Sequence, residues 1–129
     1  MRRILLVESD PFLSMLFMKR LRRREFEVRH ATHAEEALKL IDHELPDIVL
    51  TGLIMPKKSG FELIEEVRAH PEARDVPIAV YSRLGTPDDV NRCRRLGVNA
   101  YFIKAHHTPD QVIAALERAW SEAEANAIL

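Results

Sequence analysis

Short apolar runs alternate along the chain with capped, amphipathic segments, and this alternation is the feature that most constrains the fold. Parallel strands covered on both faces read as short, nearly continuous apolar runs, and each needs a crossover, usually helical, to reach the next strand. Five runs fit this description: RILLV, FEVRH, DIVL, PIAVY and AYFI. The pattern therefore predicts a parallel α/β protein with a helix after each of the five strands.

Residues that can cap a helix stand at the expected helix starts. Asp10, Thr86 and Thr108 each precede a proline, whose missing N–H would be unpaired at the first helical position anyway. Capping-box spacing, in which side chain and backbone satisfy each other's free donors, occurs at Thr32 with Glu35, Ser59 with Glu62, and Thr108 with Gln111. The stripes that the helices would bury are Leu13, Leu16, Phe17 and Leu21; Ala34, Ala37, Leu38 and Ile41; Phe61, Ile64 and Val67; Val90 and Cys93; and Val112, Leu116, Trp120 and Ala123.

Composition sets broad limits on the kind of protein. The 129 residues suit one domain spanning residues 1–129, and 19 basic against 20 acidic residues indicate neither a nucleic-acid binder nor an acidic tail. No apolar run reaches membrane-spanning length and no signal peptide is evident, so we expect a cytoplasmic protein without membrane contact. Cys93 is the single cysteine, which excludes an intrachain disulfide, and its place in a helical pattern predicts a buried thiol.

Polar side chains gather where the strands end. Right-handed crossovers place helices on both faces of such a sheet and leave a crevice beyond the carboxyl ends of the strands. Gly52 follows the third strand, in a frame suited to presenting a functional group, yet it has no side chain. The other residues expected at this edge are Glu8, Ser9 and Asp10 after the first strand, Thr51 before Gly52, Ser82 and Arg83 after the fourth, and Lys104 after the fifth.

These stretches resemble the receiver domains of bacterial two-component response regulators across essentially the whole chain. ILLVESDP is similar to the opening strand with its acidic pair, and PDIVLTGLIMPKKSGFELIEEVR to the phosphoacceptor strand, loop and third helix. PIAVYS and AYFIKA are similar to the strands that carry the switch hydroxyl and the switch aromatic with its lysine. The resemblance implies a flavodoxin-like (βα)5 three-layer sandwich, with a five-stranded parallel sheet in the order 2-1-3-4-5 and helices on both faces.

The chain departs from the family pattern at the phosphorylation site. In a working receiver, two carboxylates after the first strand and a phosphoacceptor aspartate hold Mg²⁺, and the aspartate takes phosphate from a histidine kinase. Here Glu8 fills the first acidic position, but Ser9 stands at the second, Gly52 at the phosphoacceptor and Ala105 where proline is usual. Ser82, Tyr101 and Lys104 match the switch hydroxyl, the switch aromatic and the lysine.

These departures remove the groups that phosphoryl transfer needs, namely a nucleophile and ligands for a divalent cation. Gly52 supplies no nucleophile, and the charges of Glu8 and Lys104 cancel where an intact site carries about −2. Asp10 is a nearby carboxylate, but its place before a proline favours a helix cap. We therefore predict a pseudo-receiver with no enzymatic activity, metal or cofactor, in which Lys104 pairs with Glu8 and the Lys104–Ala105 peptide is trans.

The leading hypothesis is a stand-alone signalling module that works by phosphorylation-independent protein–protein contact, since little sequence follows the fifth expected helix. The resemblance implies that another signalling protein binds the fourth helix, fifth strand and fifth helix, which carry Tyr101 and Trp120. The tail SEAEANAIL, residues 121–129, has high helix propensity and is expected to extend the fifth helix, which would allow a homodimer.

Two alternatives stay open. One is a non-covalent sensor of a small anion or nucleotide that uses Lys104, Ser82 and Arg83. The other is a nucleic-acid adaptor built on the basic run KRLRRR, residues 19–24, which is disfavoured because no recognition motif accompanies the run and because cations at a helix C-terminus offset its dipole. His106 and His107 are predicted to be a loop pair without a metal, because adjacent side chains point apart.

Overall fold

The computed structural model describes the backbone of residues 2–128 and the side chains of residues 2–119. Five strands form one parallel sheet in the order β2-β1-β3-β4-β5, as predicted. The strands are β1 (Arg2–Val7), β2 (Phe26–Ala31), β3 (Ile48–Thr51), β4 (Ile78–Ser82) and β5 (Ala100–Ile103). None of the helices in the described part of the chain is long and apolar enough to cross a membrane.

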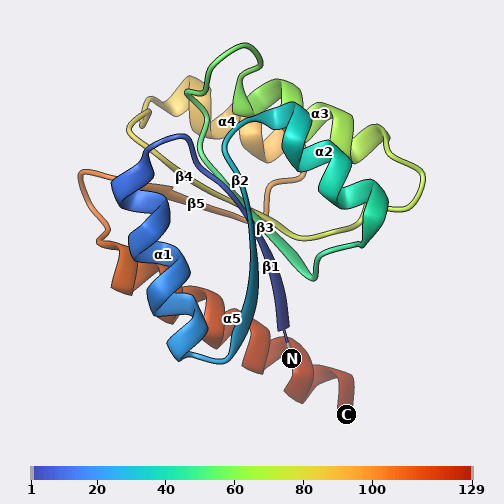
Figure 1. Cartoon of the computed structure of the whole chain (residues 1–129), viewed down its shortest axis with the longest axis vertical. Coiled ribbons are helices and arrows are strands. Elements are labelled where there is room, and N and C mark those ends of the chain that lie inside the picture. The colour runs from blue at the N-terminus through green and yellow to red at the C-terminus, as the bar shows by residue number, and fades with distance from the viewer. Residues whose placement is uncertain (1, 129) are drawn as a thin grey trace.

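Helices cover both faces of the sheet (Figure 1). They are α1 (Pro11–Arg23), α2 (Ala34–His43), α3 (Gly60–Ala69), α4 (Pro87–Arg95) and α5 (Pro109–Ile128). In Figure 1, α1 and α5 lie on one face and α2, α3 and α4 on the other. Successive side chains of β1 alternate between the two faces, so that Leu5 and Val7 pack under α2 and α3 while Ile4 and Leu6 pack under α1 and α5. The result is two cores, one on each side of a shared sheet.

Most of the expected core is buried. Of the predicted stripes, Phe17, Leu21, Ala34, Ala37, Ile41, Phe61, Ile64, Val67, Cys93, Val112 and Leu116 are buried, and Leu13, Leu16, Leu38 and Val90 are half-buried. The predictions for Trp120 and Ala123 lie outside the described side chains. Burial raises the pKa of the Cys93 thiol to about 11, which suits a structural residue and not a reactive one. The expected helical extension of α5 through the tail is confirmed as far as Ile128.

Four of the five expected caps hold, and one was wrong by a residue. Asp10, Ser59, Thr86 and Thr108 accept hydrogen bonds from backbone N–H groups in the first turns that follow them. The Thr32 prediction fails because α2 begins at Ala34, so that His33 is the capping residue and its Nδ1 accepts from the Glu36 N–H at 3.3 Å. The Thr32 N–H donates instead to the Glu36 carboxylate at 3.0 Å, which makes Glu36, and not Glu35, the acidic partner.

One arginine ties α3 to α4, and sequence reasoning missed it. The Arg68 guanidinium, near the end of α3, donates to four backbone carbonyls. Leu96 and Gly97 accept at 3.0 and 2.7 Å at the end of α4, and Arg74 and Val76 accept at 2.9 and 2.7 Å in the segment before β4. Burial lowers the pKa of Arg68 without removing its charge, so the carbonyls are held by charge-assisted hydrogen bonds.

A very close backbone approach joins α3 to the loop that follows β3. The Gly60 N–H donates to the Leu53 carbonyl at 2.8 Å, and a Cβ at position 60 would lie only 2.1 Å from the Gly52 carbonyl oxygen. Position 60 therefore requires glycine. Gly52 differs, because its backbone is not left-handed and a Cβ there would meet its nearest neighbours, Glu8 Oε1 and the Tyr81 carbonyl oxygen, at 3.7 and 3.8 Å.

We predict opposite effects of alanine at these two glycines. Gly60→Ala must displace backbone and should lower the free energy of unfolding by about 1–3 kcal/mol. Gly52→Ala fits without strain and reduces the freedom of the unfolded chain, so it should be neutral or stabilise by up to about 1 kcal/mol. Urea denaturation of both variants measures the difference, and a clear loss of stability in Gly52→Ala would contradict the packing described above.

Candidate functional site

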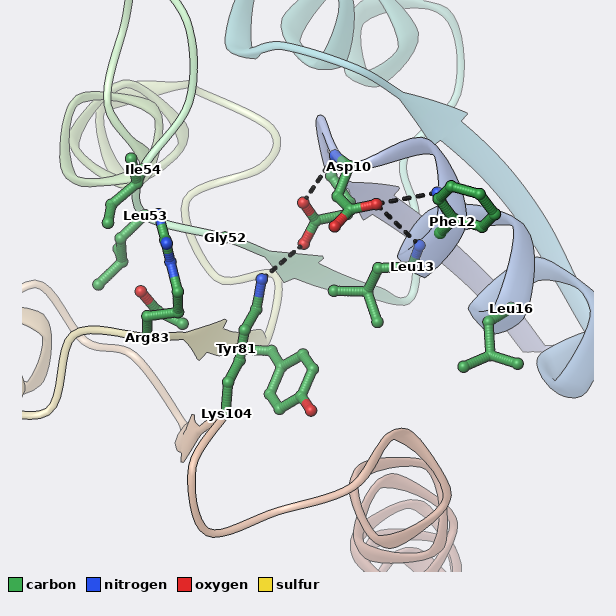
Figure 2. Close-up of a pocket in the computed structure, with 12 residues that line it drawn as sticks. Asp10, Phe12, Leu13, Leu16, Gly52, Leu53, Ile54, Tyr81, Arg83 and Lys104 are labelled. Carbon is green, nitrogen blue, oxygen red and sulfur yellow. Dashed lines mark hydrogen bonds and ion pairs between the residues drawn. The ribbon is translucent and has the colours of Figure 1, made fainter.

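A cavity of about 550 Å³ opens beyond the carboxyl ends of β1, β3, β4 and β5 (Figure 2). Of the residues that the sequence placed at this edge, Glu8, Asp10, Gly52, Ser82, Arg83 and Lys104 line the cavity. Ser9 is half-buried and does not line it. Thr51 points away from it, as expected from strand alternation, and donates its hydroxyl hydrogen to the Gly52 carbonyl at 2.9 Å.

An ion pair forms part of the cavity wall. Lys104 Nζ lies 3.5 Å from Glu8 Oε1, which confirms the predicted pair, and 5.5 Å from the centroid of the Tyr81 ring. Glu8 is buried, and its Oε2 accepts the Asp10 N–H at 3.0 Å. Both carboxylate oxygens of Glu8 therefore have partners within the protein, which offsets much of the cost of burying the charge.

The second carboxylate at the site belongs to a helix cap. Asp10 Oδ1 accepts from the N–H groups of Phe12 and Leu13 at 2.9 and 3.2 Å, as Figure 2 shows. Its charge also lies at the positive end of the α1 dipole, which stabilises it there. The cap assigned from the sequence is thus present, and the Asp10 carboxylate is committed to the backbone of α1.

The donor set does not suit Mg²⁺. A divalent hard cation favours several carboxylate oxygens, whereas Glu8 is already paired with a lysine and Asp10 with a helix terminus. Glu8 and Asp10 are balanced in charge by Arg83 and Lys104, so the lining residues sum to zero. Among the described residues, no three acids, histidines or cysteines are grouped as metal ligands would be.

The adjacent histidines after β5 lie in different surroundings. His106 is exposed, whereas the His107 ring packs edge-on against the Phe102 ring, with 5.3 Å between the ring centroids.

The residues matched to the switch hydroxyl and aromatic meet at Leu84. Ser82 Oγ accepts the Leu84 N–H at 3.2 Å, and the Tyr101 hydroxyl donates to the Leu84 carbonyl at 2.5 Å. Burial, then the nearby Cys93 and Asp89, raise the pKa of Tyr101 to about 12, which keeps the hydroxyl protonated as a donor. The loop between β4 and α4 is therefore closed by two side chains from neighbouring strands.

Two further predictions concern the loop after Lys104 and the arginine after Ser82. The Lys104–Ala105 peptide is trans, as predicted, and Ala105 is exposed. Arg83 is exposed on the cavity wall, and no hydrogen bond or ion pair joins it to another described residue. In Figure 2 its side chain lies on the side of Leu53 and Ile54, away from Asp10.

Sequence reasoning missed the apolar rim of the cavity. Phe12 is 80% exposed, Ile54 52% and Met15 58%, and the first two line the cavity from opposite sides. Large exposed apolar side chains that gather at one place commonly mark a binding surface. The signal was present in the sequence, because Phe12 and Met15 are apolar yet fall outside the buried stripe of α1.

We predict that the ion pair contributes measurable coupling to stability. Lys104→Met would leave the buried Glu8 carboxylate without its cation and should lower the free energy of unfolding by about 1–3 kcal/mol. The double variant Glu8→Gln/Lys104→Met removes the uncompensated charge and should recover at least roughly 0.5 kcal/mol of that loss. Denaturation of the single and double variants completes the cycle, and strictly additive effects would contradict a stabilising pair.

Comparison with known proteins agrees with the resemblance read from the sequence. The family model "Response regulator receiver domain" matches residues 4–117. The phosphate regulon transcriptional regulatory protein PhoB of Rhizobium meliloti is 31% identical over 123 residues, which cover 93% of this chain and 54% of PhoB. An uncharacterized 14.6 kDa protein of Leptolyngbya boryana is 34% identical over 101 residues, covering 78% of this chain and 77% of that protein.

Solved structures show the same fold. A CheY-like receiver domain protein from Methanospirillum hungatei superposes with a TM-score of 0.86 at 23% identity, over 98% of each chain. CheY4 of Vibrio cholerae gives 0.85 at 22% identity, over 92% of this chain and 98% of CheY4. The chain spans about half the length of PhoB and 15% of the gliding motility regulatory protein of Myxococcus xanthus, another relative. On the family match and this agreement in fold, the chain belongs to the response regulator receiver domains of two-component signalling.

Proposed function

We propose that this receiver domain signals by phosphorylation-independent contact with another signalling protein, and that it has no enzymatic activity of its own. The observation that carries the proposal is the empty position at the end of β3. Gly52 offers no nucleophile, although a Cβ there would meet nothing closer than 3.7 Å. Neither the backbone conformation nor the packing requires glycine at this position, so the absence of an acceptor side chain is not explained by a structural need for glycine.

Changes around Gly52 support loss of the whole phosphorylation site. Ser9 stands in place of an acid and lies outside the cavity lining, while Asp10 serves α1 as its cap. The loop frame is nevertheless kept, because the Gly60 N–H still closes onto the Leu53 carbonyl. Lys104 is also kept, but it pairs with Glu8. The loop structure is therefore kept although the groups needed for phosphorylation are absent, which is what we expect of a domain that acts through its binding surface.

The hydrogen bonds of Ser82 and Tyr101 to the Leu84 backbone support the proposal that the neighbouring surface keeps one conformation. In the family, phosphorylation couples the switch hydroxyl to the switch aromatic, whereas here Ser82 and Tyr101 hold the same loop without it. We propose that the surface beside this loop is presented constitutively. This would let the domain bind its partner in the cytoplasm, the location expected from the sequence, without a phosphorylation signal.

The proposed contact face comprises α4, β5 and α5. β5 is an edge strand, and a groove of about 120 Å³ lies between it and α4. Arg94 lines this groove and Arg95 is exposed on the same helix, which favours a partner with an acidic surface. The groove is lined by Val90, Cys93, Arg94, Val98, Asn99, Ala100 and Tyr101. A homodimer through the long α5 remains the alternative use of this side of the protein.

Pairing within the basic run weakens the nucleic-acid alternative. Arg20 lies 3.0 Å from Asp110, and Arg24 pairs with Glu117, so that α1 and α5 are joined by two ion pairs. Each of these arginines is already partly neutralised by an acid of the same protein. A phosphate backbone would have to compete with both pairs.

The proposal predicts that the wild-type protein takes no phosphoryl group from acetyl phosphate and Mg²⁺. Gly52→Asp restores a nucleophile in a site still poor in metal ligands, so labelling should be slow and partial. Adding Ser9→Asp supplies a third carboxylate and should raise the labelling sharply. Intact-protein mass spectrometry measures the added phosphoryl mass in each variant.

The matched control is Gly52→Asn with Ser9→Asp, which has the shape of the repaired site without its nucleophile and should stay unlabelled. Labelling of the wild type at Asp10 or another aspartate would overturn the proposal, because it would show that the acceptor had moved.

A second prediction concerns the loop that holds the contact face. Tyr101→Phe removes only the hydrogen bond to the Leu84 carbonyl, and should lower the free energy of unfolding by about 1 kcal/mol. It should also speed hydrogen exchange of the Leu84 amide, measured by NMR. Tyr81→Phe is the control, because it removes a comparable bond to the His107 carbonyl elsewhere and should leave exchange at Leu84 unchanged. Unchanged exchange in Tyr101→Phe would contradict a loop held by this bond.

A further inference from the structure

The cavity beside Gly52 has the size of a small-molecule site. Ligand pockets commonly enclose about 300–1,000 Å³, and this one encloses about 550 Å³. Gly52 contributes to that space, because any side chain at this position would start 3.7 Å from Glu8 Oε1 and extend the strand end into the cavity. The missing side chain thus leaves room for a bound molecule.

Half of the cavity lining is apolar. Its apolar and aromatic side chains come from α1, from the loop after β3 and from β4: Phe12, Leu13, Leu16, Leu53, Ile54 and Tyr81. Figure 2 shows Leu13, Leu16 and Tyr81 on one side of Lys104, and Leu53 and Ile54 on the other. A ligand with an apolar body would cover Phe12 and Ile54, which are 80% and 52% exposed, and would gain from removing that surface from water.

One cation on the wall is available for an anion. Lys104 is engaged with Glu8, whereas Arg83 has no partner among the described residues. A guanidinium group binds a carboxylate in a planar, two-point arrangement that suits it better than an ammonium group does. Arg83, Leu53 and Ile54 line the same cavity, and Figure 2 shows all three on one side of Lys104, so that this wall carries both charge and apolar surface.

The charge balance limits the ligand to one negative charge. Lys104 is paired with Glu8 and the Asp10 carboxylate caps α1, so among the residues that line the cavity Arg83 is the cation that meets an added anion. Further negative charges would face the two carboxylates without a cation to offset them. The balance therefore disfavours nucleotides and other polyphosphates.

We infer that this cavity binds a small monocarboxylic acid with an apolar or aromatic body, held by Arg83 and by the exposed apolar rim. The site is non-covalent and does not depend on the proposed partner contact, which lies on α4, β5 and α5. The domain then binds a ligand at the position where its relatives carry a phosphorylation site.

The test uses 4-phenylbutyrate as the probe and the neutral 4-phenylbutan-1-ol as its matched control, both titrated at millimolar concentration into the full chain. We expect the acid to shift the amide NMR signals of Gly52, Leu53 and Arg83, and to bind at least several-fold more tightly than the alcohol. Arg83→Gln should weaken binding of the acid roughly tenfold and leave the alcohol unchanged, because it removes only the charged contact. Arg74→Gln is the matched control, because Arg74 is exposed and lies outside both the cavity and the proposed contact face, and it should change neither.

The apolar part of the site is tested by filling it. Gly52→Leu should abolish binding of both probes, and if that variant does not fold, Ile54→Ser should weaken both by removing an exposed apolar wall. Absence of shifts with 4-phenylbutyrate, equal affinity for acid and alcohol, or no effect of Arg83→Gln would each overturn the inference. Tighter binding of ATP than of 4-phenylbutyrate would overturn the assignment of a monoanion.

Discussion

The parallel direction of all five strands is the constraint on which the rest of the structure depends. Each strand must be followed by a crossover over one face of the sheet, so both faces are covered and the strand ends share one edge. The residues after β1, β3, β4 and β5 meet at that edge whatever their identity. The cavity is therefore a product of topology, and the side chains only decide what it does.

The frame around the cavity is independent of the group that would do chemistry there. It is held by backbone contacts, such as the approach of Gly60 to the Gly52 carbonyl, and by caps such as Asp10. None of these contacts involves a side chain at position 52. The fold therefore needs no side chain at position 52, and the ion pair of Glu8 with Lys104 leaves no buried charge unmatched at the site.

The sequence predicted the features that depend on local pattern. Strand runs, prolines after caps and apolar stripes gave the element order and most of the core, and strand ends gave the polar residues of the cavity but not its apolar rim. The error at Thr32 reflects a helix start whose cap is a histidine, a residue that does not stand out as a capping type. The bonds of Arg68 to four carbonyls depend on how distant segments pack, which no spacing along the chain encodes.

Arg68 has a consequence for association. Its guanidinium fixes the C-terminal end of α4 through Leu96 and Gly97, while the bonds at Leu84 fix the loop at the other end of that helix. Because both ends of α4 are held in this way, the helix loses little conformational entropy when another molecule binds to it. The entropy cost of ordering this surface is thus met during folding and not during binding. A smaller contact area can then give a specific complex, because fewer contacts are needed to offset that cost.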